Sequence, residues 1–184
     1  MTTSDGAIHE ATRHLVQLGH TRLGYIGGHR ELSTGAARLA GFGRALSEAG
    51  IDPASAYTAT GPPRASFARD AFLRMIKDYA PSGVIAGGSR LTFGLLEGVD
   101  ELGVKVPADL SIVGFGDSPW SRWWGGGLTT IGLPVREIAH ASGALLLRRI
   151  RETSRPGDDQ VSRPSSAMLS SSLILRSSTA RITT

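Results

Sequence analysis

The sequence predicts an α/β protein built on a mostly parallel sheet, and three observations lead to this prediction. Short apolar runs typical of strands alternate with longer amphipathic segments typical of helices, which is the pattern of βαβ units. Several of the 24 glycines stand where a helix would end, as at Gly19, Gly50 and Gly103. The 184 residues, 40% of them hydrophobic, suffice for one domain with a buried core.

The helices are predicted from apolar residues that recur on one face. In the first, over residues 4–18, Ile8 and Leu15 share a face, and Ser4 or Asp5 can cap the amino end. Pro134 suits the first turn of the last helix, which should run to about residue 152. The other helices are expected over residues 34–49, 67–79 and 91–102.

The strands are predicted from short apolar runs between these helices. Residues 155–168 are rich in proline and serine and should form a loop. The strands are expected over residues 22–27, 57–60, 83–88, 111–115, 128–131 and 171–176.

Composition excludes several classes of function. The formal net charge is +4, but the basic residues are scattered, and the densest group, "LLLRRIRETSR", interleaves them with an acid as a solvated helix face does. No helix-turn-helix, zinc finger or heptad zipper is recognisable, so this chain alone is not expected to read a DNA sequence. No apolar run could span a bilayer. The absence of cysteine excludes disulfides and fits the cytoplasm.

Polar residues gather after three predicted strands, in "GGHRELSTGAAR", "GGSRLT" and "GFGDSPWSRWW". Ligands of open parallel sheets bind outside the carboxyl ends of the strands, where glycines let them approach the backbone. The three loops therefore predict a ligand site. Its candidate residues are His29, Arg30, Arg38, Ser89, Arg90, Asp117 and Trp120, the last with the neighbouring tryptophans.

Each of these loops also has a purely structural interpretation. The glycine pairs could form tight turns, Asp117 could cap a turn, and Arg38 could lie on the surface. The tryptophans could pack together or against a second subunit. No catalytic residue, cofactor or metal site is predicted, because phosphate-binding loops, a nucleophile elbow and metal-spaced histidines are not found.

In the order of its motifs, the chain resembles the effector-binding core of the lac repressor (LacI/GalR) family of transcription regulators. The resemblance covers nearly the whole chain. The segments that carry it are "DGAIHEATRHLVQLGHTRLGYIGG", "ARLAGFGRALSEAGI", "PSGVIAGGSRLTFGLLEGVDELGVKVPADLSIVGFGD", "LTTI" and "LILRSST".

The resemblance implies a periplasmic-binding-protein-like fold, in which two α/β lobes enclose a small-molecule effector and control an attached helix-turn-helix headpiece. Residues 20–131 and 170–176 would form the C-terminal lobe. Residues 1–18 and 133–160 would be a remnant of the N-terminal lobe. The headpiece and the first half of that lobe would be missing, as in a fragment. A homodimer that binds operator DNA only through the headpiece, and that acts as a repressor, is implied.

The resemblance also ranks the site residues. Asp5 stands where the family often has an effector-contacting acid, and Arg38 matches an arginine that commonly grips the ligand. Two acceptors that the family uses are replaced, because Gly88-Ser89 stands for Asn-Asp and Gly116 stands for the first of two acids. Leu133 stands where a glutamine is common. A donor-rich site of this kind favours an anionic or flat aromatic effector over a neutral sugar.

Two other functions remain open at this stage. A solute-binding protein of a sugar transporter would share the fold, but it would need an export signal, which the sequence lacks. A nucleotide-dependent enzyme on the same type of sheet would need a phosphate-binding motif.

Overall fold

Six strands form a single sheet in the computed structural model, which describes residues 2–153 and 169–182. The strand order is β3 (Tyr57–Gly61), β2 (Leu23–Gly28), β4 (Gly83–Ala86), β5 (Ser111–Phe115), β6 (Thr129–Gly132) and β8 (Ser172–Ile174). All neighbours are parallel except β8, which runs antiparallel to β6. The predicted α/β class and mostly parallel sheet are confirmed.

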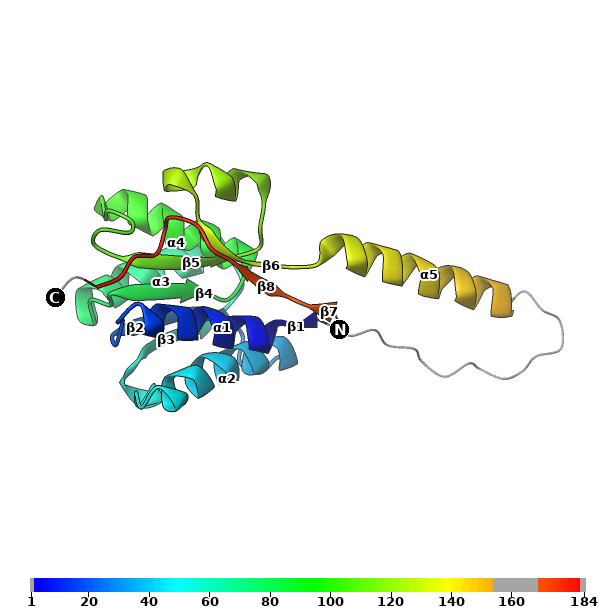
Figure 1. Cartoon of the computed structure of the whole chain (residues 1–184), viewed down its shortest axis with the longest axis horizontal. Helices are drawn as coiled ribbons and strands as arrows, with labels where there is room; N and C mark the ends of the chain where they lie inside the picture. The colour runs from blue at the N-terminus through cyan, green and yellow to red at the C-terminus, as the bar shows by residue number, and fades with distance from the viewer. Residues whose placement is uncertain (1, 154–168, 183–184) are drawn as a thin grey trace.

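Two helix pairs cover the two faces of this sheet (Figure 1). One face carries α1 (Ser4–Gln17) and α2 (Ser33–Glu48), and the other carries α3 (Ala65–Asp78) and α4 (Ser89–Leu102). Alternate residues of β2 point to opposite faces, so that Tyr25 joins the core under α1 and α2 while Ile26 joins the core under α3 and α4. Each face therefore has its own buried core.

The position of α1 corrects the expected division of the chain. Residues 1–18 were expected to lie with residues 133–160 in a second unit. Instead Ile8, Ala11 and Leu15 are fully buried in the core that α1 shares with α2 and the sheet. The apolar stripe of α1 buries against this sheet, so the expectation is wrong for α1.

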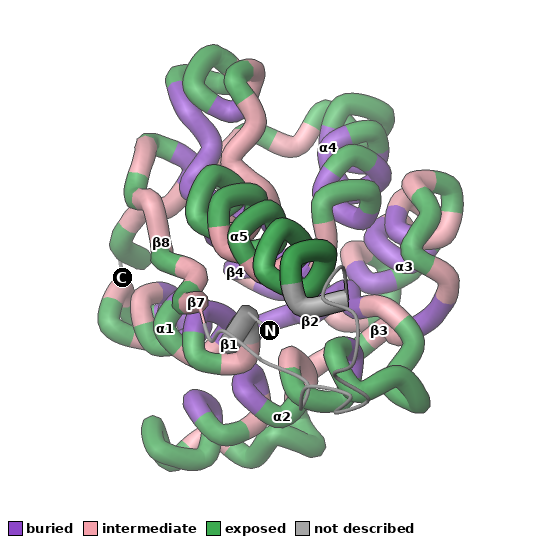
Figure 2. Tube along the Cα trace, turned by 90° about the vertical axis from the view of Figure 1, so that its right-hand side faces the viewer, coloured by how far each residue is buried: buried purple, intermediate pink, exposed green. Residues whose placement is uncertain are grey.

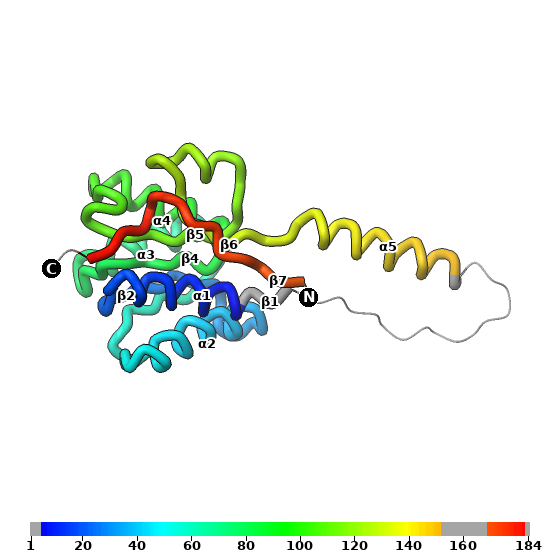
Figure 3. Tube along the Cα trace, viewed as in Figure 1, coloured from blue at the N-terminus to red at the C-terminus, as the bar shows by residue number. Residues whose placement is uncertain are grey.

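The last helix, α5 (Val135–Thr153), extends away from the sheet, as Figures 1 and 3 show. Figure 2 looks along it and shows its trace exposed over most of its length. Its apolar residues Val135, Leu146, Leu147 and Ile150 are each more than half exposed. The loop predicted over residues 155–168 lies outside the described residues.

The carboxyl-terminal segment returns across the sheet next to the first residues of the chain. β7 (Leu169–Ser170) pairs in parallel with β1 (Thr2–Thr3), two short strands that the sequence pattern did not predict. β8 then pairs in antiparallel orientation with β6, and Figure 3 shows the carboxyl-terminal trace continuing past β6. The single strand predicted over residues 171–176 is thus a shorter β8.

Glycine allows α3 and α4 to cross closely. A Cβ atom on Gly94 would stand 1.9 Å from the carbonyl oxygen of Ala65. Gly94→Ala should therefore lower the free energy of unfolding by about 1–3 kcal/mol, because the helices must separate. Gly143→Ala is the matched control, because nothing lies within 4 Å of its Cβ position on α5, and it should cost nothing. Urea unfolding of both variants measures the difference, and equal midpoints would contradict the close crossing.

Candidate ligand site at the carboxyl ends of the strands

The carboxyl ends of β2, β4 and β5 meet at one edge of the sheet, because these three parallel strands are neighbours. Helices α2 and α4 begin just beyond β2 and β4, at Ser33 and Ser89. Their amino-terminal N–H groups therefore face the same edge, where anionic groups are favoured. The loops singled out in the sequence lie together at this edge.

Arg38 of α2 spans two strands at this edge. Its Nη1 donates a hydrogen bond of 2.8 Å to the carbonyl oxygen of Gly87, and its guanidinium lies 4.2 Å from the ring centre of Phe115. Burial lowers the pKa of Arg38, while the nearby Tyr25 opposes this effect. A guanidinium remains charged under such conditions. The structure thus places a half-buried cation at the predicted ligand edge.

A cavity of about 120 Å³ lies beside Arg38. The backbone of Gly28, Gly87 and Gly88 forms part of its wall. This volume equals roughly four water molecules at ~30 Å³ each, so it could hold one group of a ligand. Its side-chain lining combines polar His29, Thr34 and Arg38 with apolar Leu32, Pro63 and Leu91.

Tyr25 is a residue of this edge that the sequence analysis missed. It is fully buried, stacks on Phe42 at 5.2 Å between ring centres, and its hydroxyl makes no hydrogen bond with the described residues. Burial raises the pKa of Tyr25 to about 12, and the charge of Arg38 acts in the opposite direction. Cβ atoms on Gly27 and Gly87 would stand 2.4 and 2.3 Å from the phenol. Gly27 and Gly87 leave the space that the ring of Tyr25 occupies, and they were the sequence signal for it, although the glycine pairs were interpreted as possible tight turns.

Ser89 and Gly116, two of the positions that depart from the family pattern, lie side by side. The backbone of Gly116 has a φ of 87°, and a Cβ atom there would stand 2.5 Å from the Ser89 hydroxyl. Glycine adopts this φ without strain, whereas an acid would not, and it would also displace the serine. Ser89 itself is exposed at the start of α4.

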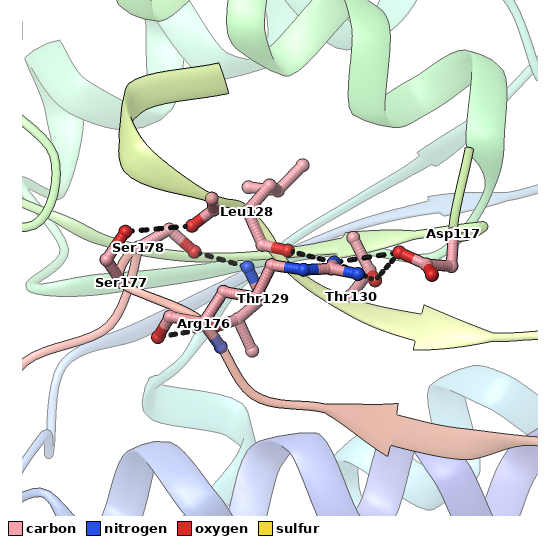
Figure 4. A network of polar contacts seen from close by, with 8 residues as sticks. Asp117, Leu128, Thr129, Thr130, Arg176, Ser177 and Ser178 are labelled. Carbon is pink, nitrogen blue, oxygen red and sulfur yellow. Dashed lines mark hydrogen bonds and ion pairs between the residues drawn. The ribbon is translucent and has the colours of Figure 1, made fainter. Parts of the chain in front are cut away.

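Asp117 has contacts that the sequence analysis did not predict (Figure 4). Its carboxylate forms a 2.7 Å ion pair with Arg176 and accepts a hydrogen bond from Thr130 at 3.0 Å. Arg176 also donates to the carbonyl oxygen of Leu128 at 2.7 Å. The hydrogen bond from Arg176 holds the pKa of Asp117 below its ordinary value, against partial burial, which raises it. This network fixes the carboxyl-terminal segment to β6.

The remaining candidates are spread around the same edge. Trp120 is half-buried and packs against Phe93 of α4, with 4.7 Å between ring centres. Asp5 is half-buried in the first turn of α1. His29 is exposed, with its Nδ1 3.9 Å from the Glu31 carboxylate. Of the predicted residues, the cavity beside Arg38 brings together Arg38 and His29, whereas Asp5, Ser89, Asp117 and Trp120 do not line it.

Within residues 2–153 and 169–182, no group of three histidine or acidic side chains is placed to hold a metal ion. Over the same part of the chain, no helix combines the length and apolar character that a membrane span requires.

Comparison with known proteins identifies a common domain type. The family described as "periplasmic binding protein-like domain" matches residues 12–179. The HTH-type transcriptional repressor PurR of Proteus mirabilis is 34% identical over 153 residues, which are 81% of this chain and 45% of that protein. PurR of Klebsiella pneumoniae is 33% identical over 141 residues, 76% of this chain and 41% of that protein. The chain thus spans less than half the length of these relatives.

Solved structures show the same fold. A LacI family transcriptional regulator from Enterococcus faecium with bound ribose matches with a TM-score of 0.85 and 26% identity, over 99% of this chain and 65% of that one. A LacI transcriptional regulator from a Rhodococcus species matches with a TM-score of 0.83 and 28% identity, over 98% of this chain and 63% of that one.

Proposed function

Because the chain belongs to the periplasmic binding protein-like domain family, we propose that it is the effector-sensing part of a LacI-type bacterial transcription regulator. The observation that carries this proposal is the cavity beside Arg38, at the carboxyl ends of the strands. Glycine backbone, a desolvated cation and apolar walls meet there, which is the composition of a small-molecule site. The resemblance of the chain to repressors favours a regulator over a transporter component.

The effector is a compound with a carboxylate, a phosphate or a flat ring. The guanidinium of Arg38 supplies donors and a positive charge to the cavity, His29 lines it as well, and no acidic side chain among the described residues does. Leu32, Pro63 and Leu91 provide apolar surface for a ring. A neutral sugar needs acceptors for its hydroxyl groups, and Gly116 and Gly88 provide no side-chain acceptor. Ser89, Asp5 and Trp120 would contact outer parts of the effector, while Asp117 acts through its ion pair.

Operator DNA is bound by a helix-turn-helix headpiece carried elsewhere in the full-length regulator, and the protein works as a homodimer. In this arrangement α5 packs within a second lobe, where its exposed apolar residues are covered. Effector binding between the lobes then changes their orientation and so the spacing of the headpieces. The proposed function includes no enzymatic reaction, so the effector dissociates chemically unaltered.

A thermal-shift screen tests this function. Small carboxylates, phosphorylated metabolites, nucleosides and neutral sugars, including ribose, would be added separately to the full-length regulator. At 100 times its Kd a ligand stabilises the folded state by about 2.7 kcal/mol, which corresponds to a rise in Tm of roughly 3–5 °C for a protein more than 300 residues long. We expect this rise from an anionic or flat-ring compound. A rise caused by ribose alone would contradict the effector class, and no rise with any class would contradict the sensing function.

A further inference from the structure

Residues 177–182, here called the clasped segment, run to the amino ends of the strands, at the opposite edge of the sheet from the cavity beside Arg38. They form neither helix nor strand. Ala180 N–H donates to the hydroxyl of Ser111, the first residue of β5, at 3.0 Å. Ile182 N–H donates to the carbonyl oxygen of Leu18 at 3.0 Å. The segment is therefore held by individual hydrogen bonds to the lobe.

Two histidines of the lobe contact consecutive residues of the clasped segment. His14, in the last turn of α1, has its Nε2 3.0 Å from the Thr179 hydroxyl. His20 is buried, with its Nε2 3.0 Å from the carbonyl oxygen of Ala180 and its Nδ1 2.9 Å from the Ser82 hydroxyl. A carbonyl oxygen only accepts, so Nε2 of His20 donates and Nδ1 accepts. The neutral imidazole thus uses both of its nitrogens.

The surroundings of both histidines favour this neutral form. Burial lowers the pKa of His14, and the nearby His20 lowers it as well. Burial also lowers the pKa of His20, while its hydrogen bond to the carbonyl oxygen of Ala180 acts in the opposite direction. Within the described part of the chain, no acidic side chain acts on either ring. A positive charge on the pair therefore has no counter-charge there.

The charged side chains of the neighbouring elements do not change this. Arg22 donates to the carbonyl oxygen of Tyr79 and lies over its ring. The Asp109 carboxylate accepts from Lys105 N–H at 2.9 Å. Arg181, the charged residue of the clasped segment, is exposed and acts on neither histidine. The two imidazoles are therefore the groups at this place that can respond to pH.

Protonation costs buried charge here and not lost hydrogen bonds. Once protonated, Nδ1 of His20 would donate to the Ser82 hydroxyl, whose own hydrogen can turn to the carbonyl oxygen of Arg22, 3.3 Å away. A proton on His14 would then place a second cation beside the first, away from bulk water, where repulsion is stronger. Opening the clasped segment exposes both rings to water and relieves this cost.

We propose that His14 and His20 form a proton-sensitive clasp, which holds residues 177–182 against the lobe near neutral pH and releases them in acid. In the open state both histidines titrate at their ordinary pKa of 6.5, and in the closed state they titrate below it. The open state therefore binds more protons, so the clasp is complete above about pH 6.5 and weakens as the pH falls below this value. This inference does not depend on the proposed function.

Hydrogen exchange of the chain at pH 7.5 and 5.5, followed by mass spectrometry and corrected for the intrinsic effect of pH on exchange, tests the clasp. A histidine of ordinary pKa is mostly protonated at pH 5.5, so each can weaken the clasp by at most about tenfold. We expect the peptide that contains residues 177–182 to lose at least about fivefold of its protection in acid, and peptides of α4 to lose none. Equal protection of the clasped segment at both pH values, or an equal loss in α4, would overturn the proposal.

The ion pair of Asp117 with Arg176 does not interfere at pH 5.5. The pKa of Asp117 lies below its ordinary value of 3.8, because Arg176 donates a hydrogen bond to its carboxylate. This ion pair therefore stays charged in the experiment and keeps β8 in place. The expected loss of protection should accordingly be confined to residues after Arg176.

Variants identify the groups that respond. His14→Gln keeps a polar side chain near Thr179 but cannot be protonated, so it should roughly halve the acid-induced loss on a logarithmic scale. The double variant with His20→Gln should abolish the loss. His9→Gln is the matched control, because His9 lies on the same helix but contacts Glu48, at 2.7 Å, and it should behave as the parent does. A parent-like loss in the double variant would count against the clasp.

A titration of the parent chain needs no substitution and so does not depend on the folding of a variant. The ring signals of His14 and His20 would be followed by NMR across the same pH range. Both histidines should titrate below pH 6.5, the ordinary value. If both titrated at this value while the lobe stayed folded, the clasp would not respond to protons as proposed.

Discussion

Replacement of Arg38 by alanine should weaken effector binding by about tenfold to more than a hundredfold. The loss of one desolvated, charge-assisted contact costs about 1.5–3 kcal/mol, and each 1.4 kcal/mol is about tenfold in affinity. The variant would be titrated with the strongest compound of the thermal-shift screen. Arg38→Lys should give an intermediate affinity, since lysine keeps the charge but lacks the planar fork.

The control for this prediction is Arg30→Ala, at the same edge of the sheet. The Arg30 side chain is 70% exposed and its contact with Glu31 is long, at 3.7 Å. Binding by this variant should match that of the parent. Thermal unfolding of each variant checks that the lobe is intact, since Arg38 also contacts Gly87 and Phe115. Parent-like affinity in Arg38→Ala would remove Arg38 from the site.

Replacement of Arg176 by methionine should lower the free energy of unfolding by about 3 kcal/mol at neutral pH. The ion pair with Asp117 is mostly buried, with 15% and 19% of the two side chains exposed. Removing one partner leaves a desolvated charge, which is strongly destabilising. The double variant with Asp117→Asn should recover part of the loss. Urea unfolding at pH 7 measures all three proteins.

Arg69→Met is the matched control, because its ion pair with Glu101 is close, at 2.6 Å, but exposed, with 39% and 42% of the side chains accessible. Exposed pairs contribute no more than about 1 kcal/mol. If Arg69→Met and Arg176→Met lost equal stability, the network around Asp117 would not hold the carboxyl-terminal segment as described.

The ion pair between Asp117 and Arg176 also predicts how the free energy of unfolding changes at acid pH. The folded-state pKa of Asp117 lies below its ordinary value of 3.8. The stabilisation is therefore complete above that ordinary value and is lost as the pH falls through the folded-state pKa. The stability difference between the parent and Asp117→Asn should be constant near neutral pH and shrink below about pH 4.

The fold follows from local patterns to a large extent. The helix periodicity around Ile8 and Leu15 and the glycines near the ends of three helices, Gly19, Gly50 and Gly103, predict elements correctly, because these signals depend on a few neighbouring residues. The membership of α1 in the core was missed. A stripe of apolar residues shows that a helix packs, but not against which sheet.

The position of the candidate site in the fold could be predicted in part from the order of the strands. Parallel order brings the strand ends together, so Arg38 and His29 could be expected at one edge. Tyr25 was not among the predicted site residues, because a tyrosine within an apolar run indicates a core position. Only Gly27 and Gly87, which leave space for its ring, distinguish it from other core residues. The ion pair of Asp117 with Arg176 joins residues far apart in the sequence, and only the antiparallel pairing of β8 with β6 brings them together.

The most direct test of the proposed effector site is a crystal structure of the full-length regulator with the strongest compound of the thermal-shift screen. We predict that the compound occupies the cavity beside Arg38, with an anionic group or ring in contact with the guanidinium and the backbone of Gly87 and Gly88. A compound bound elsewhere, with the Arg38 cavity unchanged, would contradict the account.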